Sequence, residues 1–313
     1  MTKRKGLLIS VLLIFSILLF TACGTTKEKG NAEESTDTIT IQHSLGETKV
    51  DKNPKRVVVF DYGTLDSLDK MNVEIVGLPK ANIPSSLEKF NDDKYENVGA
   101  LKEPDFEKIF ELQPDIIFIS GRQAESYEEF EKIAPTVYME VDGADYMGSV
   151  IKNAKILGEI FDKEEFVEQE LANINDAIQE LNQEVVDSEK NALIVLANDG
   201  MISAYGEGSR FGIIHREFGF IPVDKGIEVS NHGQSITFEY ILEKNPDVVF
   251  VVDRAAVTGG STSAKQIFDN DIIKQTEAYK NGKIVYLNSE IWYVASGGLT
   301  GTKTMIEDVQ SNF

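Results

Sequence analysis

The chain has 313 residues, with 52 acidic and 31 basic side chains and a formal net charge of −21. This acidic balance argues against nucleic acid or an anionic lipid surface as a general partner, because both carry negative charge themselves. A hydrophobic content of 42% is enough to build cores, which excludes a wholly disordered chain. The single cysteine excludes an intrachain disulfide framework and a cysteine-based zinc site.

The N-terminal segment has the pattern of a secretory signal. Three basic residues at positions 3–5 precede an apolar run of 15 residues at 6–20, short for a membrane span of about 20 residues but right for the core of a signal peptide. The small residues before Cys23 resemble the lipobox of bacterial lipoproteins, although Phe20 stands where Leu is usual. We therefore expect residues 1–22 to be a signal peptide and Cys23 to be the lipidated first residue of the mature chain. An ordinary signal peptide with an incidental cysteine is the alternative.

The segment after Cys23 is polar and has no apolar period, which is typical of a flexible tether, here residues 23–37. We expect acyl chains to hold the folded body at the outer face of a bacterial cytoplasmic membrane, without a spanning helix. This location argues against a cytoplasmic enzyme.

The folded body is expected to begin with an antiparallel hairpin over residues 38–50, whose apolar positions alternate on both sides of a turn at 45–47. Short apolar runs separated by helical patterns follow, which predicts a βαβ order and largely parallel sheets. The predicted strands are Val57–Phe60, Val73–Val76, Ile116–Ser120, Thr136–Met139, Leu193–Ala197, Val248–Val252 and Ile284–Leu287.

A long helix is predicted between the two groups of strands. Asp162 followed by Glu165 has the character of a capping box, with Asp in place of Ser or Thr. Apolar residues then recur at spacings of three and four, as on one face of a helix of about 20 residues; they are Val167, Leu171, Ile174, Ile178 and Leu181. We therefore expect an N-terminal lobe over 38–161, a connecting helix over 162–185 and a C-terminal lobe over 186–313.

The two expected lobes share a sequence pattern. Residues 106–122, FEKIFELQPDIIFISGR, align without a gap with residues 238–254, FEYILEKNPDVVFVVDR, at an offset of 132. Each segment predicts a helix, a Pro-Asp turn and a buried strand that ends in arginine. Duplication would give two pseudo-symmetric lobes with a ligand cleft between them, because ligands bind at domain junctions and at the carboxyl ends of parallel strands. Convergence on a common αβ pattern is the alternative.

Three arginines are candidate ligand-binding residues. Arg122 and Arg254 follow strands at equivalent positions, and Arg210 lies in the glycine-rich loop 205–212. Arginine keeps its charge and presents five donors in a rigid fork. Three such cations in an acidic protein would form a local positive pocket, confined to a Debye length of about 8 Å, for a compact polyanion. For each arginine alone, a surface salt bridge is the alternative.

His232 and Tyr293 are candidate donors to a metal. His232 lies in the polar loop 230–235, and Tyr293 lies between the last predicted strand and a final helix. Phenolate and imidazole both serve Fe(III). Two ligands do not saturate an octahedral ion, so a chelator would supply the rest. A solvated loop histidine and a tyrosine packed in the cleft wall are the alternatives.

These segments resemble the ferric-siderophore-binding lipoproteins of bacterial ABC importers, and among them the petrobactin and catecholate binders. The resemblance covers nearly the whole chain, from the lipobox through NPKRVVVFDYGTLDSLD, VGALKEPDFEKI, SRFG, NHGQSITFEYI and IWYVASGGL. It implies an α/β fold of two Rossmann-like lobes joined by a single long helix, with small hinge closure. It also implies a monomeric binding protein without enzymatic activity or an intrinsic cofactor, whose ligand is an Fe(III)–siderophore.

The resemblance implies roles for the candidate residues. Arg122, Arg210 and Arg254 would clamp a trianionic Fe(III)–catecholate centre through charge-assisted hydrogen bonds. His232 and Tyr293 would fill two iron sites when the siderophore is tetradentate and stay uncoordinated when it is hexadentate.

The resemblance also implies a docking role for two glutamates. Glu107 and Glu239 are the second residues of the two repeated segments, and each would meet an arginine of the ABC permease dimer. Acidic residues favoured by the dipole at a helix N-terminus are the alternative.

Other functions have weaker support. The sequence has no Walker A segment and no GxSxG elbow, and GEGSRFG spaces its glycines as GxGxxxG rather than GxGxxG, which argues against a nucleotide-dependent enzyme or a hydrolase.

The same architecture could carry haem, cobalamin, a hydroxamate complex or a bare metal ion. Hydroxamate complexes are neutral or cationic and do not call for three arginines, whereas haem carries two carboxylates and is the least excluded. A surface adhesin would leave the arginines unexplained.

Overall fold

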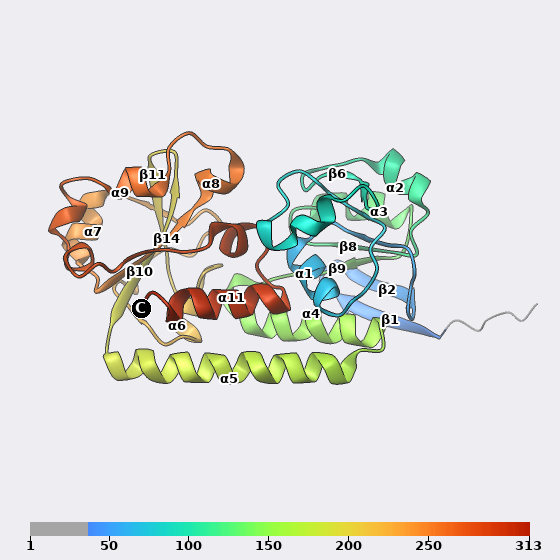
Figure 1. Ribbon diagram of the computed structural model, residues 1–313, viewed down its shortest axis with the longest axis horizontal. Helices are drawn as coiled ribbons and strands as arrows, with labels where there is room; N and C mark the ends of the chain where they lie inside the picture. Colours follow the sequence, from blue (N-terminus) through green and yellow to red (C-terminus); the bar gives the residue numbers. More distant parts are fainter. Residues whose placement is uncertain (1–36) are drawn as a thin grey trace, which may run out of the picture. The chain divides into compact units, whose positions relative to one another are not determined.

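The computed structural model describes residues 37–313 (Figure 1). Cys23, the expected signal peptide and all but the last residue of the expected tether lie outside the described residues, so those assignments stay predictions. Within 37–313, no helix combines the length and the apolar character needed to cross a bilayer.

The described chain begins with the predicted antiparallel hairpin, in which β1 (Thr38–His43) pairs with β2 (Gly46–Asp51). Ile41 and Val50 are buried while their neighbours along each strand are exposed, because successive side chains of a strand point to opposite faces. Thr48 fastens the hairpin to the N-terminal lobe, since its Oγ1 donates to the carbonyl of Thr136 at 2.6 Å.

The N-terminal lobe is built on a five-stranded sheet whose strands are all parallel. Its spatial order is β5 (Glu96–Asn97), β4 (Gly77–Leu78), β3 (Val57–Val59), β8 (Ile116–Ile119) and β9 (Thr136–Tyr138). After β3 the chain adds β4 and β5 on one side of it, and then adds β8 and β9 on the other side. A separate short ribbon pairs β6 (Gly99–Ala100) with β7 (Glu103–Pro104).

Helices cover this sheet. They are α1 (Tyr62–Lys70), η1 (Ser85–Asn91), α2 (Phe106–Leu112), η2 (Ala124–Ser126), α3 (Tyr127–Glu131), η3 (Gly143–Asp145) and α4 (Tyr146–Ile160).

The strand predicted at Val73–Val76 is wrong in its position. The strand β4 forms directly after it, at Gly77–Leu78. Ile75 is buried in the main core and Val73 packs against that core. The apolar residues of this run therefore pack into the core without pairing as a strand. Strand pairing with β3 begins at Gly77.

The C-terminal lobe contains a mixed six-stranded sheet. Its path is β13 (Gln234–Ile236), β11 (Met201–Tyr205), β10 (Asn191–Asn198), β14 (Val248–Asp253) and β15 (Ile284–Tyr286), with β12 (Ile221–Pro222) also paired to β10. The β10, β12, β14 and β15 strands are parallel, and β11 is antiparallel to both of its neighbours. The helices of this part are α6 (Ile213–Arg216), α7 (Phe238–Lys244), α8 (Arg254–Thr258), α9 (Ala264–Phe268), η4 (Ile273–Gln275), α10 (Glu277–Lys280), η5 (Glu290–Val294) and α11 (Leu299–Gln310).

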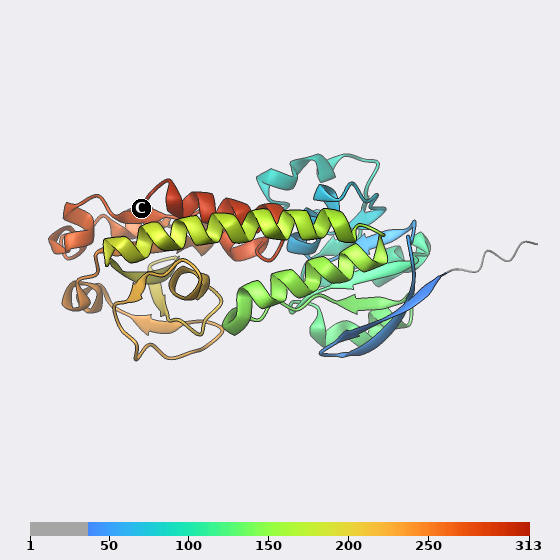
Figure 2. The same ribbon diagram turned by 90° about the horizontal axis from the view of Figure 1, so that it is seen from below.

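One long helix, α5 (Glu164–Ser188), connects the two sheets (Figure 2). Its predicted apolar face is the face that packs: Val167, Ile174 and Leu181 are buried, and the two intervening apolar residues lie partly buried against the same core. The helix α4 and the helix α11 both pack against α5. The main core is therefore continuous from one lobe to the other along these helices.

The predicted capping box at the start of α5 is wrong. The N-cap is Lys163, which makes no side-chain cap hydrogen bond. Asp162 lies one residue earlier, with φ +50, and its carboxylate accepts from Lys52 Nζ at 2.8 Å and from Asn53 Nδ2. A contact with a residue 110 positions away thus replaces the local cap.

The two repeated segments have the same local structure. In the first, Asp105 caps α2 by accepting from the N–H of Lys108, and Gln113 ends the helix with φ +46. In the second, Thr237 caps α7 by accepting from the N–H of Tyr240, and Asn245 ends the helix with φ +44. Each helix then leads through the Pro-Asp turn into a buried strand, β8 or β14.

The last helix, α11, ties the lobes together because it packs against both α5 and α1. Its N-terminus is capped from α1: Asp66 Oδ2 accepts from the N–H groups of Thr300 at 2.8 Å and Gly301 at 3.0 Å. The first N–H groups of a helix lack intrahelical partners and require such acceptors. Burial raises the pKa of Asp66 to about 6, while these two hydrogen bonds act in the opposite direction.

We predict that Asp66→Asn changes how stability depends on pH. The carboxyl has a pKa of about 6 in the folded chain against an ordinary 3.8, so it holds its proton more tightly when folded. The unfolding free energy of the wild-type chain should therefore fall, relative to that of D66N, by about 2–3 kcal/mol in total as pH rises from about 4 to about 6. Urea unfolding across this pH range measures the difference. A difference that is constant or that grows with pH would contradict the raised pKa.

Candidate ligand-binding site

Tyr293, in the π-helical turn η5, is the point at which the three predicted arginines meet. Its carbonyl oxygen accepts from Arg122 Nη2 at 2.9 Å and from Arg210 Nη2 at 3.0 Å. Its hydroxyl oxygen accepts from Arg254 Nε at 2.7 Å. We call these four residues the arginine–tyrosine cluster. It joins the lobes, because Arg122 lies in the N-terminal lobe, in the turn after β8, and the other three residues follow the long helix.

Arg122 and Arg254 reach the cluster because each follows the carboxyl end of a central strand. In the N-terminal sheet the strand order reverses between β3 and β8, and there Ser120 Oγ donates to Asp61 Oδ1 at 2.9 Å. In the C-terminal sheet the equivalent neighbours are β10 and β14, and Arg254 Nη1 donates to Asn198 Oδ1 at 2.8 Å. Ligands of α/β sheets bind at such reversal points.

Arg210 is held by a tight turn and by two aromatic rings. Ser209 shapes the turn, because its Oγ donates to the carbonyl of Gly206 at 2.6 Å and its own carbonyl accepts from Gly212 at 2.8 Å. The guanidinium carbon lies 4.6 Å from the centre of the Tyr293 ring and 5.0 Å from that of Phe211. Cation–π contacts of this kind orient the guanidinium without neutralising its charge.

The turn that presents Tyr293 is fixed from both sides. Trp292 is 1% exposed, and its Nε1 donates to Asp308 Oδ2 of α11 at 3.0 Å. On the other side, Glu290 Oε2 accepts from the backbone N–H of Ser85, in the N-terminal lobe, at 2.9 Å. The acceptor atoms of Tyr293 are therefore held in place by contacts with both lobes.

The cluster carries positive charge that carboxylates do not compensate. Within residues 37–313, the ion pairs of the structure leave out Arg122, Arg210 and Arg254. Burial, reinforced by the neighbouring Arg122, lowers the pKa of Arg210 from its ordinary value. Carbonyl and hydroxyl oxygens satisfy the guanidinium donors but bring no negative charge. The arrangement therefore favours a bound anion.

Asn198 is a residue of the site that the sequence analysis missed. It is the last residue of β10 and orients Arg254 through the hydrogen bond to its Nη1. A signal was present in the sequence, because Asn198 is a polar residue directly after an apolar strand, the same position that identified Arg122 and Arg254.

His232 is not brought to the cluster. It is exposed in a turn in which the N–H of Gly233 donates to the carbonyl of Ser230 at 3.2 Å, and in the described part of the chain no hydrogen bond or ring contact joins it to Tyr293. Among residues 37–313 there is also no group of three or more His, Cys, Asp or Glu side chains placed to hold a metal ion.

Glu107 and Glu239 lie away from the cluster, as the second residues of α2 and α7. Both side chains are exposed. Neither takes part in the ion pairs formed within the described range 37–313.

Two surface hollows lie elsewhere on the molecule. One, of about 330 Å³, is lined by Asn53, Pro54, Lys55, Asn72, Val73, Glu74, Phe161 and Lys163. The other, of about 200 Å³, is lined by Glu140, Asp142, Asp145, Gly148, Ser149 and Lys152. Neither is lined by the arginine–tyrosine cluster, so the candidate site is defined here by its contacts, and the ligand cleft stays a prediction.

Two α/β lobes on a long helix, with a cationic cluster where the strand orders reverse, define the class as a two-lobed binding protein. The comparison of sequences agrees: the profile of the periplasmic binding protein family matches residues 57–291. The chain belongs to this family, which is a family of solute-binding proteins.

Several relatives are similar over nearly their whole length. The petrobactin-binding protein YclQ of Bacillus subtilis (strain 168) is 48% identical over 313 residues, covering 98% of each chain. The ferric-anguibactin-binding protein FatB of Vibrio anguillarum is 34% identical and covers 94% of each chain.

Solved structures give the same picture. The crystal structure of YclQ from Bacillus subtilis matches with a TM-score of 0.87 and 50% identity, over 88% of this chain and 98% of that chain. The periplasmic catecholate-siderophore binding protein VctP from Vibrio cholerae matches with a TM-score of 0.84 and 37% identity, over 88% of this chain and all of the other. The predicted fold class is confirmed.

Proposed function

We propose that this protein captures a ferric catecholate siderophore at the outer face of the cytoplasmic membrane and delivers it to an ABC permease. The observation that carries the proposal is the convergence of Arg122, Arg210 and Arg254 on Tyr293 without carboxylate partners among residues 37–313. The names of its relatives support the ligand class, since YclQ is named for petrobactin and VctP for catecholate siderophores. Iron is cargo here, enclosed by its chelator.

The arginines would bind the ligand by replacing their present acceptors. A catecholate oxygen that carries negative charge is a stronger acceptor for a guanidinium than the neutral carbonyl of Tyr293. Pairing of three cations with a trianionic centre gains strength where water is partly excluded. The two lobes, taken as residues 38–161 and 186–313, would share the ligand, because Arg122 comes from one and Arg210 and Arg254 from the other.

Tyr293 and His232 would take part differently. The Tyr293 hydroxyl already lies inside the cluster, where its oxygen accepts a hydrogen bond from Arg254 Nε. His232 would have to move with its loop to reach the same iron. With a tetradentate siderophore both would complete the octahedron, and with a hexadentate one they would remain outside it.

The permease would dock on the exposed glutamates of α2 and α7. A helix runs antiparallel to the strand that follows it, so Glu107 and Arg122 belong to the same edge of the N-terminal sheet, as do Glu239 and Arg254 in the other lobe. The two helices also match beyond the glutamates, with Phe110 and Leu242 at the same offset and Phe110 67% exposed. In Figure 1, α2 lies at the upper right of the molecule and α7 at its left end, one in each lobe.

The remaining parts of the proposal concern the membrane. Cys23 would carry the lipid and residues 23–37 would act as the tether, so that a monomeric binding protein stays close to the permease. A single acyl chain binds membranes only marginally, and stable anchoring takes two or more signals, which the multiply acylated cysteine of a lipoprotein would supply.

We predict that Arg254→Ala weakens binding of a trianionic ferric tris-catecholate by about 10- to 100-fold. Binding of a neutral ferric tris-hydroxamate should change by less than about twofold, because it offers no charge for Arg254 to pair with. Quenching of Trp292 fluorescence measures both affinities, since Trp292 is the only tryptophan and adjoins Tyr293. Equal losses for the two complexes would refute the charge argument.

We predict that Tyr293→Phe separates ligands by denticity. The phenylalanine variant keeps the backbone carbonyl but loses the phenolic oxygen, so affinity for a ferric bis-catecholate should fall by about tenfold or more while that for a hexadentate complex stays within about threefold. The charge-transfer absorption of the bis-catecholate complex should shift at the same time. An unchanged absorption band would show that Tyr293 does not coordinate iron.

We predict that Glu107→Lys and Glu239→Lys each reduce siderophore-dependent iron uptake by cells about fivefold or more, while the affinity of the purified protein stays unchanged. Reversed charge would repel a cationic docking partner. Glu243→Lys is the matched control, because Glu243 is another exposed acid of α7. Uptake that falls equally in all three variants would indicate a general charge effect and contradict specific docking.

A further inference from the structure

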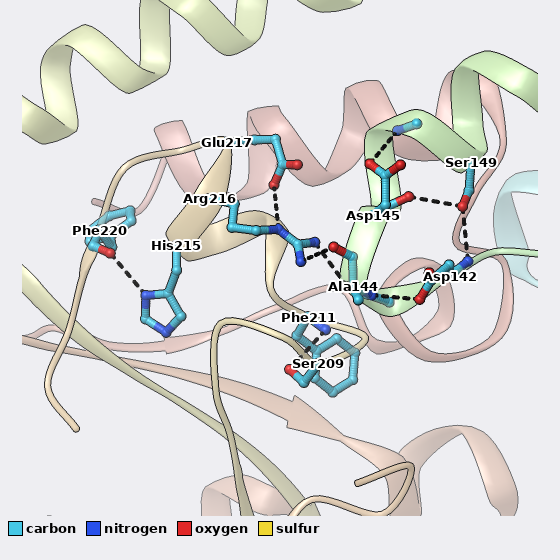
Figure 3. A network of polar contacts seen from close by, with 12 residues as sticks. Asp142, Ala144, Asp145, Ser149, Ser209, Phe211, His215, Arg216, Glu217 and Phe220 are labelled. Carbon is cyan, nitrogen blue, oxygen red and sulfur yellow. Dashed lines mark hydrogen bonds and ion pairs between the residues drawn. The ribbon is translucent and has the colours of Figure 1, made fainter. Parts of the chain in front are cut away.

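A segment of the N-terminal lobe lies directly against the loop that carries Arg210. The segment is η3 (Gly143–Asp145), and Figure 3 shows Arg216 of α6 reaching its Ala144. Arg216 Nη2 donates to the carbonyl of Gly143 at 2.9 Å, and its Nη1 donates to the carbonyl of Ala144. A single guanidinium fork from the C-terminal lobe therefore holds two consecutive carbonyls of the other lobe.

Gly143 is pressed against the backbone of Arg210 itself. A Cβ placed on Gly143 would lie 2.6 Å from Arg210 N and 2.7 Å from Arg210 Cα. Real Cβ atoms do not approach backbone so closely, so only glycine fits without a shift of the backbone at this interlobe contact. Arg210 is thus supported from behind by the N-terminal lobe while its guanidinium reaches Tyr293.

The supporting segment is itself held by hydrogen bonds within the N-terminal lobe. Asp142 Oδ1 accepts from the N–H of Ala144 at 2.8 Å, and the N–H of Asp142 donates to Ser149 Oγ at 2.9 Å (Figure 3). Ser149 Oγ donates in turn to the carbonyl of Asp145 at 2.9 Å, so the segment is fastened to α4. A displacement of the N-terminal lobe would therefore move Gly143 as part of that lobe.

Contacts within the loop also fix the segment between Arg210 and Arg216. The N–H of Arg216 donates to the carbonyl of Gly212 at 2.9 Å, and a Cβ on Gly212 would lie within 2.1 Å of the carbonyl oxygen of Glu207. The Arg216 side chain also lies 3.8 Å from a carboxylate oxygen of Glu217. The segment η3 of the N-terminal lobe therefore contacts two parts of this loop, the backbone of Arg210 and the guanidinium of Arg216.

We propose that Gly143 and Arg216 are positioning residues that set the Arg210 guanidinium for anion binding and make its position depend on how the two lobes meet. Neither residue belongs to the arginine–tyrosine cluster. The proposal rests on the proposed function in one respect, that Arg210 contacts the ligand. Its structural content, the control of Arg210 by an interlobe contact, is separate from the identity of the ligand.

The first test uses the ligand-free protein. The chain has six arginines, few enough for each Nε–H group to be assigned by NMR of arginine-labelled full-length protein. Arg216→Lys keeps the charge but loses the fork that spans two carbonyls, and Gly143→Ala forces the Arg210 backbone to move. Both variants should shift or broaden the Arg210 Nε–H signal and leave that of Arg56 in place. An unmoved Arg210 signal in both variants would overturn the proposal.

The second test is a double-mutant cycle on binding of a trianionic ferric tris-catecholate. Arg216→Lys should weaken binding by about 3- to 30-fold in the wild-type background and by less than about twofold when Arg210 is already replaced by Met. Equal losses in both backgrounds would show that Arg216 acts on binding by another route and would overturn the proposal.

Two controls separate the possible failures. Gly121→Ala is the matched glycine control, because its new Cβ would meet only Tyr138 Oη, at an ordinary 3.7 Å; it should leave the Arg210 signal in place. Thermal unfolding of every variant reports any loss of folding. A wild-type chain that does not bind the tris-catecholate would overturn the proposed function, whereas the NMR result still decides the positioning of Arg210.

Discussion

The structure depends on one oxygen atom that accepts hydrogen bonds from guanidinium groups of both lobes. The carbonyl of Tyr293 receives Arg122 and Arg210, and the hydroxyl of the same residue receives Arg254. Like charges brought this close repel one another, so the arrangement exists only if the surrounding structure holds it. An anion placed among the three guanidinium groups would relieve this repulsion, which is the physical basis of the charge selectivity that we propose for the site.

The fold supports this cluster by bracing the lobes at several independent places. The helices α5 and α11 share one continuous core with both sheets. Asp66 of the first lobe caps the N-terminus of α11, Glu290 of the second accepts from Ser85, and Arg216 grips η3. A long helix resists bending more than extended strands do, and these side contacts restrict rotation about it. Small rather than wide lobe movements are consistent with this bracing.

The repeated segments explain why the residues proposed for ligand binding and for docking fall on one edge of each sheet. Within residues 106–122 and 238–254, an acidic residue begins the helix and an arginine follows the strand. Because helix and strand run in opposite directions, both ends of the segment come to the carboxyl edge of the sheet. In the proposed function, ligand binding and presentation to a permease would therefore be properties of the same structural unit, used once in each lobe.

The sequence by itself determined the features that depend on local pattern. Apolar spacing predicted the buried face of α5. The segments repeated at an offset of 132 residues predicted two helix–turn–strand units, and in the structure the caps and the left-handed residues that end the two helices agree. Strand ends and a glycine-rich loop identified Arg122, Arg254 and Arg210. Only the tertiary structure decided that these arginines share Tyr293, that Asn198 orients Arg254, that Asp162 binds Lys52 instead of capping α5, and that Gly143 supports Arg210. Each of these contacts joins residues far apart in the chain. The local spacing of apolar and polar residues determines helices and strands, but it does not indicate which distant residues will become neighbours.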